Sequence, residues 1–131
     1  VDYLTKNKNV ERVIYPNIHT GELGDRAKRY FKGGNGGLVG IEVKGGVEAG
    51  KKFIEALKMF YHVANIGDAR SLAIHPATTT HSQLNQEELL AAGVTPGYVR
   101  LSIGIEHPDD IIADLDQALS ASSKPSLKVV S

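Results

Sequence analysis

The sequence predicts an α/β domain of two layers, with a sheet of three to five strands and helices on one face. Strand-like and helix-like segments alternate along the chain, which is typical of this class. The stretch VRLSIGIE (residues 99–106) alternates apolar residues with others, as a half-buried strand does. With 131 residues, the chain is long enough to form one domain with a sizeable core.

The first third of the chain predicts two strands and two helical segments. Residues 1–8 resemble the end of a helix, and residues 10–15 (VERVIY) a short strand that a Pro-Asn pair ends. Residues 22–31 have helical composition and spacing. The glycine-rich run 33–37 breaks this helix, and residues 38–43 form the next strand.

The middle of the chain contains the clearest helix, which we expect over residues 47–61. Its apolar stripe consists of Phe53, Ile54, Leu57, Phe60 and Tyr61. Residues 71–74 predict a strand that a proline ends, and residues 86–91 predict a short helix.

The last strand is expected over residues 98–105, with one continuous apolar face formed by Val99, Leu101, Ile103 and Ile105. A final helix is expected to begin at His107 and Pro108, since proline in the first turn and carboxylates after it both favour a helix start. The end of the chain, residues 120–131, is small and polar and is expected to fray.

The composition excludes several classes of function. Fifteen basic residues balance fifteen acidic ones without a run of like charges, so nothing indicates a nucleic-acid partner. The chain has no cysteine, which excludes disulfides, thiolate metal sites and a cysteine nucleophile. No apolar run approaches the length of a membrane span or a signal-peptide core, and a cytoplasmic protein is the expectation. The start without Met, inside a helix-like segment, predicts a piece of a longer protein.

Arg100 is the residue that the strand pattern leaves unexplained. It shares its face of the strand with Ser102 and Gly104, whose small side chains leave room above the sheet. A guanidinium there needs an anionic partner, because burying an unpaired charge is unfavourable. Two alternatives stay open: an ion pair with an acid of the chain, or a bidentate contact with a ligand carboxylate or phosphate.

Other candidate sites have structural interpretations. The glycine-rich run precedes a strand, whereas a phosphate loop follows one, so we interpret it as a connecting loop. His75 and His81 lie six residues apart with Pro76 between them, which is not the spacing of a helical zinc pair, and a capping or turn role is expected. Residues 78–80 are three threonines, which bind either a ligand or the loop backbone.

Three long stretches carry a resemblance to a known family. They are KRYFKGGNGGLVGIEVKGGVEAGKKFIEALKMF, ANIGDARSLAIHPATTTHSQL and GVTPGYVRLSIGIEHPDDIIADLDQAL. Over residues 1–121 the chain resembles the C-terminal domain of the pyridoxal-phosphate enzymes of cysteine and methionine metabolism. Within this family it is most similar to the O-acetylhomoserine sulfhydrylases.

The resemblance implies the small C-terminal domain of the aspartate-aminotransferase-like (fold type I) enzymes, whose short sheet is mainly antiparallel with helices on one face. It implies a domain over residues 1–121 and a flexible tail over residues 122–131. In this family a large domain upstream holds pyridoxal phosphate on a lysine. The chain by itself is therefore expected to hold no catalytic residue, cofactor or metal and to be inactive alone.

The resemblance also implies roles for three residues. Arg100 is expected to bind the α-carboxylate of the amino-acid substrate, Asn65 to contact the same carboxylate, and Thr80 to lie near cofactor and substrate. The implied reaction replaces the acetate of O-acetylhomoserine by sulfide or a thiol, in methionine and homocysteine biosynthesis, in an enzyme that is a homo-oligomer at full length.

Two alternatives remain beside this reading. One is a relative of cystathionine γ-synthase or methionine γ-lyase, against which Asn65 argues, since the γ-lyase branch often has Ser there. The other is a stand-alone, non-catalytic module that binds a small anion or a partner.

Overall fold

The sheet of this protein has five strands. The computed structural model describes residues 1–123, apart from the side chain of Gln86. The strands are β1 (Val10–Ile14), β2 (Leu38–Val43), β3 (Tyr61–His62), β4 (Leu72–Ile74) and β5 (Tyr98–Ser102). Their order is β1-β2-β5-β4-β3, and every neighbouring pair is antiparallel except β3 and β4. The predicted two-layer α/β fold with a mainly antiparallel sheet is confirmed.

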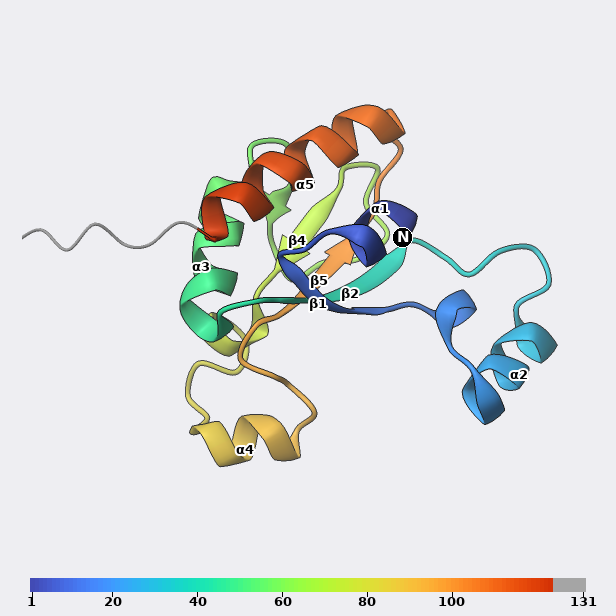
Figure 1. Cartoon of the computed structure of the whole chain (residues 1–131), viewed down its shortest axis with the longest axis horizontal. Helices are drawn as coiled ribbons and strands as arrows, with labels where there is room; N and C mark the ends of the chain where they lie inside the picture. Colours follow the sequence, from blue (N-terminus) through green and yellow to red (C-terminus); the bar gives the residue numbers. More distant parts are fainter. Residues whose placement is uncertain (124–131) are drawn as a thin grey trace, which may run out of the picture.

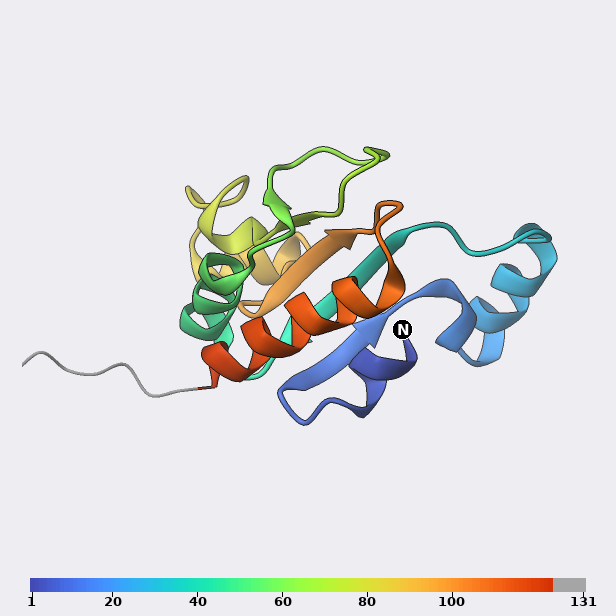
Figure 2. The same cartoon turned by 90° about the horizontal axis from the view of Figure 1, so that it is seen from above.

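The helices are α1 (Asp2–Lys6), α2 (Gly21–Tyr30), α3 (Gly46–Ala56), α4 (Gln86–Ala91) and α5 (Pro108–Ser122). Figure 1 shows α3 and α5 together at the sheet, whereas α2 projects to the side and α4 lies apart. Figure 2 shows α5 running along the sheet. No helix within residues 1–123 is both long and apolar enough to cross a membrane.

The core lies between the sheet and the pair α3 and α5. Its fully buried side chains come from both layers: Ile41 of β2, Val99 and Leu101 of β5, Phe53 of α3 and Leu119 of α5. Burial of each such side chain stabilises the fold by about 1.5–3 kcal/mol. The opposite face of the sheet has no comparable cover from these two helices, and its strand residues remain available for other contacts.

Two helix starts follow from local chemistry that the sequence displays. Asn85 and Glu88 form a capping box at the start of α4, each side chain accepting the backbone N–H of the other residue. At the start of α5, the His107 side chain accepts the N–H of Asp109, and Pro108 occupies the first turn. Both predicted starts are confirmed. The expectation that the chain frays from residue 120 is wrong for residues 120–122, because α5 runs to Ser122; residues 124–131 of the predicted tail lie outside the described residues.

The predicted helix over residues 47–61 is too long, because α3 ends at Ala56. The carboxylate of Asp114 accepts the backbone N–H groups of Lys58 and Met59, each at 2.9 Å. It also accepts that of Phe60 at 3.3 Å. These three donors are therefore not available to continue the helix, and the chain turns into β3.

The predicted strand over residues 98–105 is also too long, because β5 ends at Ser102. Beyond it, the N–H of Ile103 bonds to the carbonyl of Gly37 at 2.8 Å, and that of Ile105 to the carbonyl of Ala69 at 2.9 Å. The side chain of Ile105 is 86% exposed, so it does not belong to the apolar face on which the alternation placed it.

His75 is a structural residue buried next to α3. Its Nε2 lies 2.8 Å from the carbonyl oxygen of Pro96, which can only accept, so Nε2 carries the proton. Nδ1 then accepts the hydroxyl of Thr78 at 2.9 Å. Gly50 of α3 leaves room for this ring, since a Cβ there would lie 2.6 Å from Nε2. The role is structural, as expected, but it lies within the core rather than in a cap.

We expect Gly50→Ala to destabilise the protein by about 1–3 kcal/mol, because the added methyl group forces His75 from its position. Helix propensity alone predicts the opposite sign, a gain of about 1 kcal/mol. Gly33→Ala is the matched control: that residue has open space around it and no positive φ. Chemical denaturation of both variants measures the effect, and a Gly50→Ala protein as stable as the control would contradict the packing described.

Below pH 6.5 we expect the free energy of unfolding to decrease because of His75. Burial, with a smaller contribution from the charge of His62, lowers the pKa of His75 from its ordinary 6.5, although the Pro96 carbonyl opposes this. The unfolded chain then binds a proton at a pH where the folded chain does not, so the free energy of unfolding decreases as the pH is lowered. Denaturation of wild type and His75→Gln between pH 7 and pH 5 tests this. A variant with the wild-type slope would refute it.

Candidate functional site

Arg100 lies in the middle of the central strand, on the face opposite α3 and α5. Its neighbours in register are Gly40 on β2 and Ile74 on β4. Alternation places Tyr98 and Ser102 on the same face. The strand β5 lies between β2 and β4, so the backbone beneath the guanidinium is held from both sides (Figure 1).

The guanidinium of Arg100 is held by neutral acceptors. Its Nη2 donates to the backbone carbonyl of Ala64 at 2.8 Å and to that of Asn65 at 3.1 Å. The ion pairs found within the described residues all involve other groups. The first alternative for Arg100, an ion pair with an acid of the chain, is therefore wrong for residues 1–123.

The Nε atom of Arg100 is buried and has no hydrogen-bond partner. A buried donor without a partner is unfavourable by about 1–3 kcal/mol, and more for a charged group. The two carbonyls thus orient the side chain but leave its charge and part of its donor fork free. A planar fork of this kind matches a carboxylate or a phosphate. The arrangement can bind a small anion.

The space that the sequence suggested above Ser102 and Gly104 is filled by the protein itself. Residues 63–70, called here the covering loop, cross this end of the sheet. The N–H of Gly67 donates to the hydroxyl of Ser102 at 3.4 Å. A Cβ at Gly104 would collide with the carbonyl oxygen of Ala69. The small residues therefore admit the covering loop rather than a ligand directly.

Of the other two predicted site residues, Asn65 contacts Arg100, whereas Thr80 contacts His81. Asn65 is exposed and contributes its backbone carbonyl, and its side-chain amide makes no hydrogen bond to any described residue. The hydroxyl of Thr80, also exposed, lies 2.9 Å from Nδ1 of His81. Asn65 therefore contacts Arg100 through its backbone, and the side chains of Asn65 and Thr80 lie at the surface.

A hollow of about 440 Å³ lies beside Thr80. Its lining residues are His62, Val63, Ala64, Ile74, Thr79 and Thr80. Arg100 and Asn65 are not among these lining residues, although Ala64 accepts a hydrogen bond from Arg100 and Ile74 is its register neighbour. A larger, mostly apolar groove of about 500 Å³ lies between α1 and the start of α5 and contains none of the three predicted site residues.

The residues at this site suit an anion better than a metal or a covalently attached cofactor. Within residues 1–123 no three His, Asp or Glu side chains lie close enough together to hold a metal ion. The lining of the 440 Å³ hollow includes no lysine, the side chain that forms a Schiff base with an aldehyde cofactor. The donors present are a guanidinium, an amide and a hydroxyl.

Three contributors to this geometry were not predicted as site residues. The carbonyl of Ala64 holds Arg100, and a backbone acceptor leaves no signature in the sequence. Ser71 and Glu106 bond to each other and fix the end of the covering loop. Glu106 was recognisable only as one of several available carboxylates, since its partner lies 35 residues away.

Nearly all of the described residues match one protein family. The family model for Cys/Met metabolism PLP-dependent enzymes matches residues 1–120. The chain is 54% identical over 119 residues to O-acetyl-L-homoserine sulfhydrylase of Leptospira meyeri, covering 90% of the chain and 27% of that protein. It is 50% identical over 118 residues to O-acetyl-L-homoserine sulfhydrylase 1 of Thermus thermophilus, covering 90% and 28%.

Two further matches come from a second enzyme and from a solved structure. The chain is 44% identical over 119 residues to an L-methionine gamma-lyase of Fusobacterium nucleatum, covering 91% of the chain and 30% of that protein. A crystal structure of a putative O-acetylhomoserine (thiol)-lyase from Campylobacter jejuni, which carries a pyridoxyl-lysine phosphate, superposes with a TM-score of 0.82 at 41% identity. That match covers 91% of the chain and 28% of the solved one, so the chain spans under a third of its relatives' length.

Proposed function

The chain belongs to the Cys/Met metabolism PLP-dependent enzyme family, and on that premise we propose that it is the substrate-binding C-terminal domain of a longer O-acetylhomoserine sulfhydrylase. The reaction replaces the acetate of O-acetylhomoserine by sulfide or a thiol, as a transferase does. The observation that carries the proposal is the oriented but unneutralised guanidinium of Arg100, whose buried Nε has no partner.

In this proposal Arg100 binds the α-carboxylate of the amino acid. The guanidinium donates to the carboxylate from hydrogens that Ala64 and Asn65 do not use, and such charge-assisted hydrogen bonds are about twice as strong as neutral ones. The amide N–H of Asn65 donates to the same carboxylate, and Thr80, which lines the 440 Å³ hollow together with Ala64, lies near cofactor and substrate. Holding the carboxylate restricts rotation about the substrate Cα, which is an orientation effect on the reaction.

The cofactor is held elsewhere in the proposed enzyme, because no lysine lines the site described above. When bound in the longer protein, pyridoxal phosphate supplies the electron sink that stabilises negative charge at the substrate Cα. The residues of this chain position the substrate and hold its charge. We propose that residues 1–121 are inactive alone and that the full-length protein is a cytoplasmic homo-oligomer.

Sequence identity to the two bacterial sulfhydrylases favours a sulfhydrylase over the methionine γ-lyase alternative. The identities to the two bacterial sulfhydrylases are 54% and 50%, against 44% to the methionine gamma-lyase. Assay of the full-length enzyme with O-acetylhomoserine plus sulfide, and separately with methionine, distinguishes replacement from elimination by the amino-acid product or the α-keto acid formed.

The stand-alone module is distinguished from the enzyme by the mass of the protein in its source cells. We expect a polypeptide several times heavier than the 14.1 kDa of this chain, since its relatives are several times longer. Intact mass spectrometry of the endogenous protein measures it. A mass near 14.1 kDa would exclude the catalytic proposal and leave Arg100 as an anion-binding or structural residue.

In the full-length enzyme, we expect Arg100→Ala to raise KM for O-acetylhomoserine about 100-fold, because the charge-assisted hydrogen bonds to the substrate carboxylate are lost. Arg100→Lys should remain impaired by about tenfold or more, since an ammonium has no planar fork. Steady-state kinetics at saturating sulfide measure both.

The matched control is Arg12→Ala on β1, which removes an exposed arginine paired with Glu42 and should leave KM unchanged. A second control uses 3-aminopropyl acetate, the substrate without its carboxylate. Its inhibition constant should be the same for wild type and Arg100→Ala. If Arg100→Ala has the KM of wild type, the carboxylate role of Arg100 is excluded.

A further inference from the structure

Ser71, Gly104 and Glu106 form a compact set of hydrogen bonds, called here the Ser71 clasp. The carboxylate of Glu106 accepts the backbone N–H of Ser71 at 2.7 Å through Oε1 and its hydroxyl at 2.8 Å through Oε2. The same hydroxyl accepts the N–H of Gly104 at 2.9 Å. Ser71 is fully buried, and its hydroxyl both donates and accepts, so its position is closely defined.

The clasp fixes the C-terminal end of the covering loop. Ser71 directly follows residues 63–70, and next to it the N–H of Ile105 bonds to the carbonyl of Ala69 at 2.9 Å. The N-terminal end is fixed separately, since the N–H of Val63 bonds to the carbonyl of Ala73 at 3.2 Å. The covering loop is therefore held at both ends, and only one of these ends depends on a carboxylate.

Gly104 makes the clasp possible by letting two backbone segments approach closely. A Cβ at this residue would collide with the carbonyl oxygen of Ala69 and come within 2.5 Å of both the carbonyl carbon of Arg70 and Oε2 of Glu106. Any side chain at this position would thus separate the covering loop from the segment that follows β5 and pull Glu106 from Ser71.

Arg100 is linked to the clasp through the covering loop, because within residues 1–123 its guanidinium donates hydrogen bonds to Ala64 and Asn65 alone. An arginine side chain has several freely populated rotamers, and these two carbonyls select one of them. A shift of the covering loop moves both acceptors together. The direction in which the free Nε–H points is therefore set by the position of the loop.

We propose that Glu106 is a positioning residue that acts through Ser71 and the covering loop to orient Arg100 toward the substrate carboxylate. The inference rests on the proposed function, because it presumes that Arg100 binds that carboxylate. Glu106 itself is occupied by Ser71 and does not touch substrate. Its charge strengthens the bonds to Ser71, since hydrogen bonds to an ionised acceptor are about twice as strong as neutral ones.

The electrostatics of Glu106 agree with this role. Burial raises the pKa of its carboxyl, but the N–H groups of Ser71 and of Glu106 itself, the Ser71 hydroxyl and the charge of Arg70 outweigh it. The net effect lowers the pKa below its ordinary 4.5, so the carboxylate stays ionised at neutral pH.

A double-mutant cycle in the cofactor-loaded, full-length enzyme tests the proposal. Glu106→Gln puts an amide N–H where Ser71 needs an acceptor, and we expect KM for O-acetylhomoserine to rise about tenfold, with KM for sulfide unchanged. In an Arg100→Ala background the same substitution should change KM by less than about twofold, because its effect passes through Arg100. The inhibition constant of 3-aminopropyl acetate should not change.

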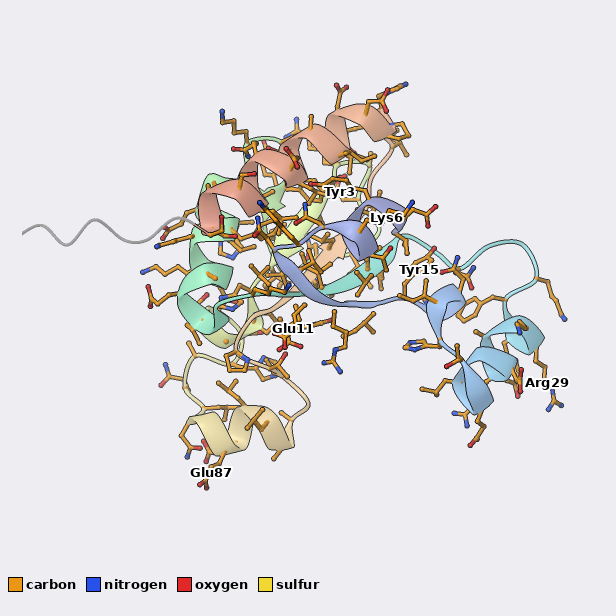
Figure 3. The ribbon with its side chains drawn as sticks, viewed as in Figure 1. Tyr3, Lys6, Glu11, Tyr15, Arg29 and Glu87 are labelled. Atoms are coloured by element: carbon orange, nitrogen blue, oxygen red, sulfur yellow. The ribbon has the colours of Figure 1, made fainter. Side chains whose placement is uncertain are left out.

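The matched control is Glu11→Gln on β1, the same chemical change at an exposed carboxylate outside the clasp (Figure 3). It should keep the wild-type KM in both backgrounds. A merely structural role of Glu106 would lower the melting temperature and affect both substrates and both backgrounds alike.

The outcomes separate this inference from the proposed function. If Arg100→Ala leaves KM unchanged, the proposed function fails and the inference fails with it. If Arg100→Ala raises KM but Glu106→Gln does not, or acts equally in the Arg100→Ala background, only the inference is overturned. If Glu106→Gln does not yield folded enzyme, Ser71→Ala is tested in its place. The Ser71→Ala variant keeps the backbone hydrogen bond to Glu106, so we expect KM for O-acetylhomoserine to rise about threefold, and this rise should disappear in the Arg100→Ala background. An unchanged KM overturns the inference.

Discussion

The buried carboxylate of Asp114 is the contact on which the arrangement of this chain depends. It accepts three successive N–H groups after α3, and Gln117, one turn along α5, donates to the carbonyl of Ala56 at 2.6 Å. These bonds end α3 and direct the chain into β3, which pairs parallel to β4. A parallel neighbour requires a connection that runs back along the sheet. The connection between β3 and β4 contains no helix, and its covering loop brings the carbonyls of Ala64 and Asn65 to Arg100.

The partners of the two arginines on the sheet explain why only one of them is suited to bind an anion. Arg12 pairs with Glu42 across β1 and β2 at 3.2 Å, so its charge is already compensated by a neighbouring strand. Arg100 has two carbonyl oxygens, which fix the direction of its Nη2–H bonds without cancelling the positive charge. Orientation without neutralisation favours a carboxylate that arrives from outside, since that anion need not displace an internal one.

The sequence predicted those parts of the fold whose causes are local. The start of α4 follows from Asn85 and Glu88, which cap one another three residues apart, and the start of α5 follows from Pro108. The end of α3 could not be predicted, because its cause is Asp114, more than fifty residues away. Likewise, the pattern of β5 singled out Arg100 as anomalous, but its holding groups are backbone carbonyls 35 and 36 residues distant, which no side-chain pattern displays.

The sequence indicated that the small residues beside Arg100 leave space for a ligand, but the covering loop occupies that space. Ser102 and Gly104 admit the covering loop, and the close approach at Ala69 is one that only glycine permits. Larger side chains at residues 102 and 104 would have placed bulk or charge beside Arg100. The backbone of the covering loop instead provides neutral hydrogen-bond acceptors at a fixed distance from each other. Neutral acceptors are what a guanidinium needs if it is to be held still and remain charged. The small residues therefore explain Arg100 indirectly, by bringing the peptide carbonyls that leave its charge available.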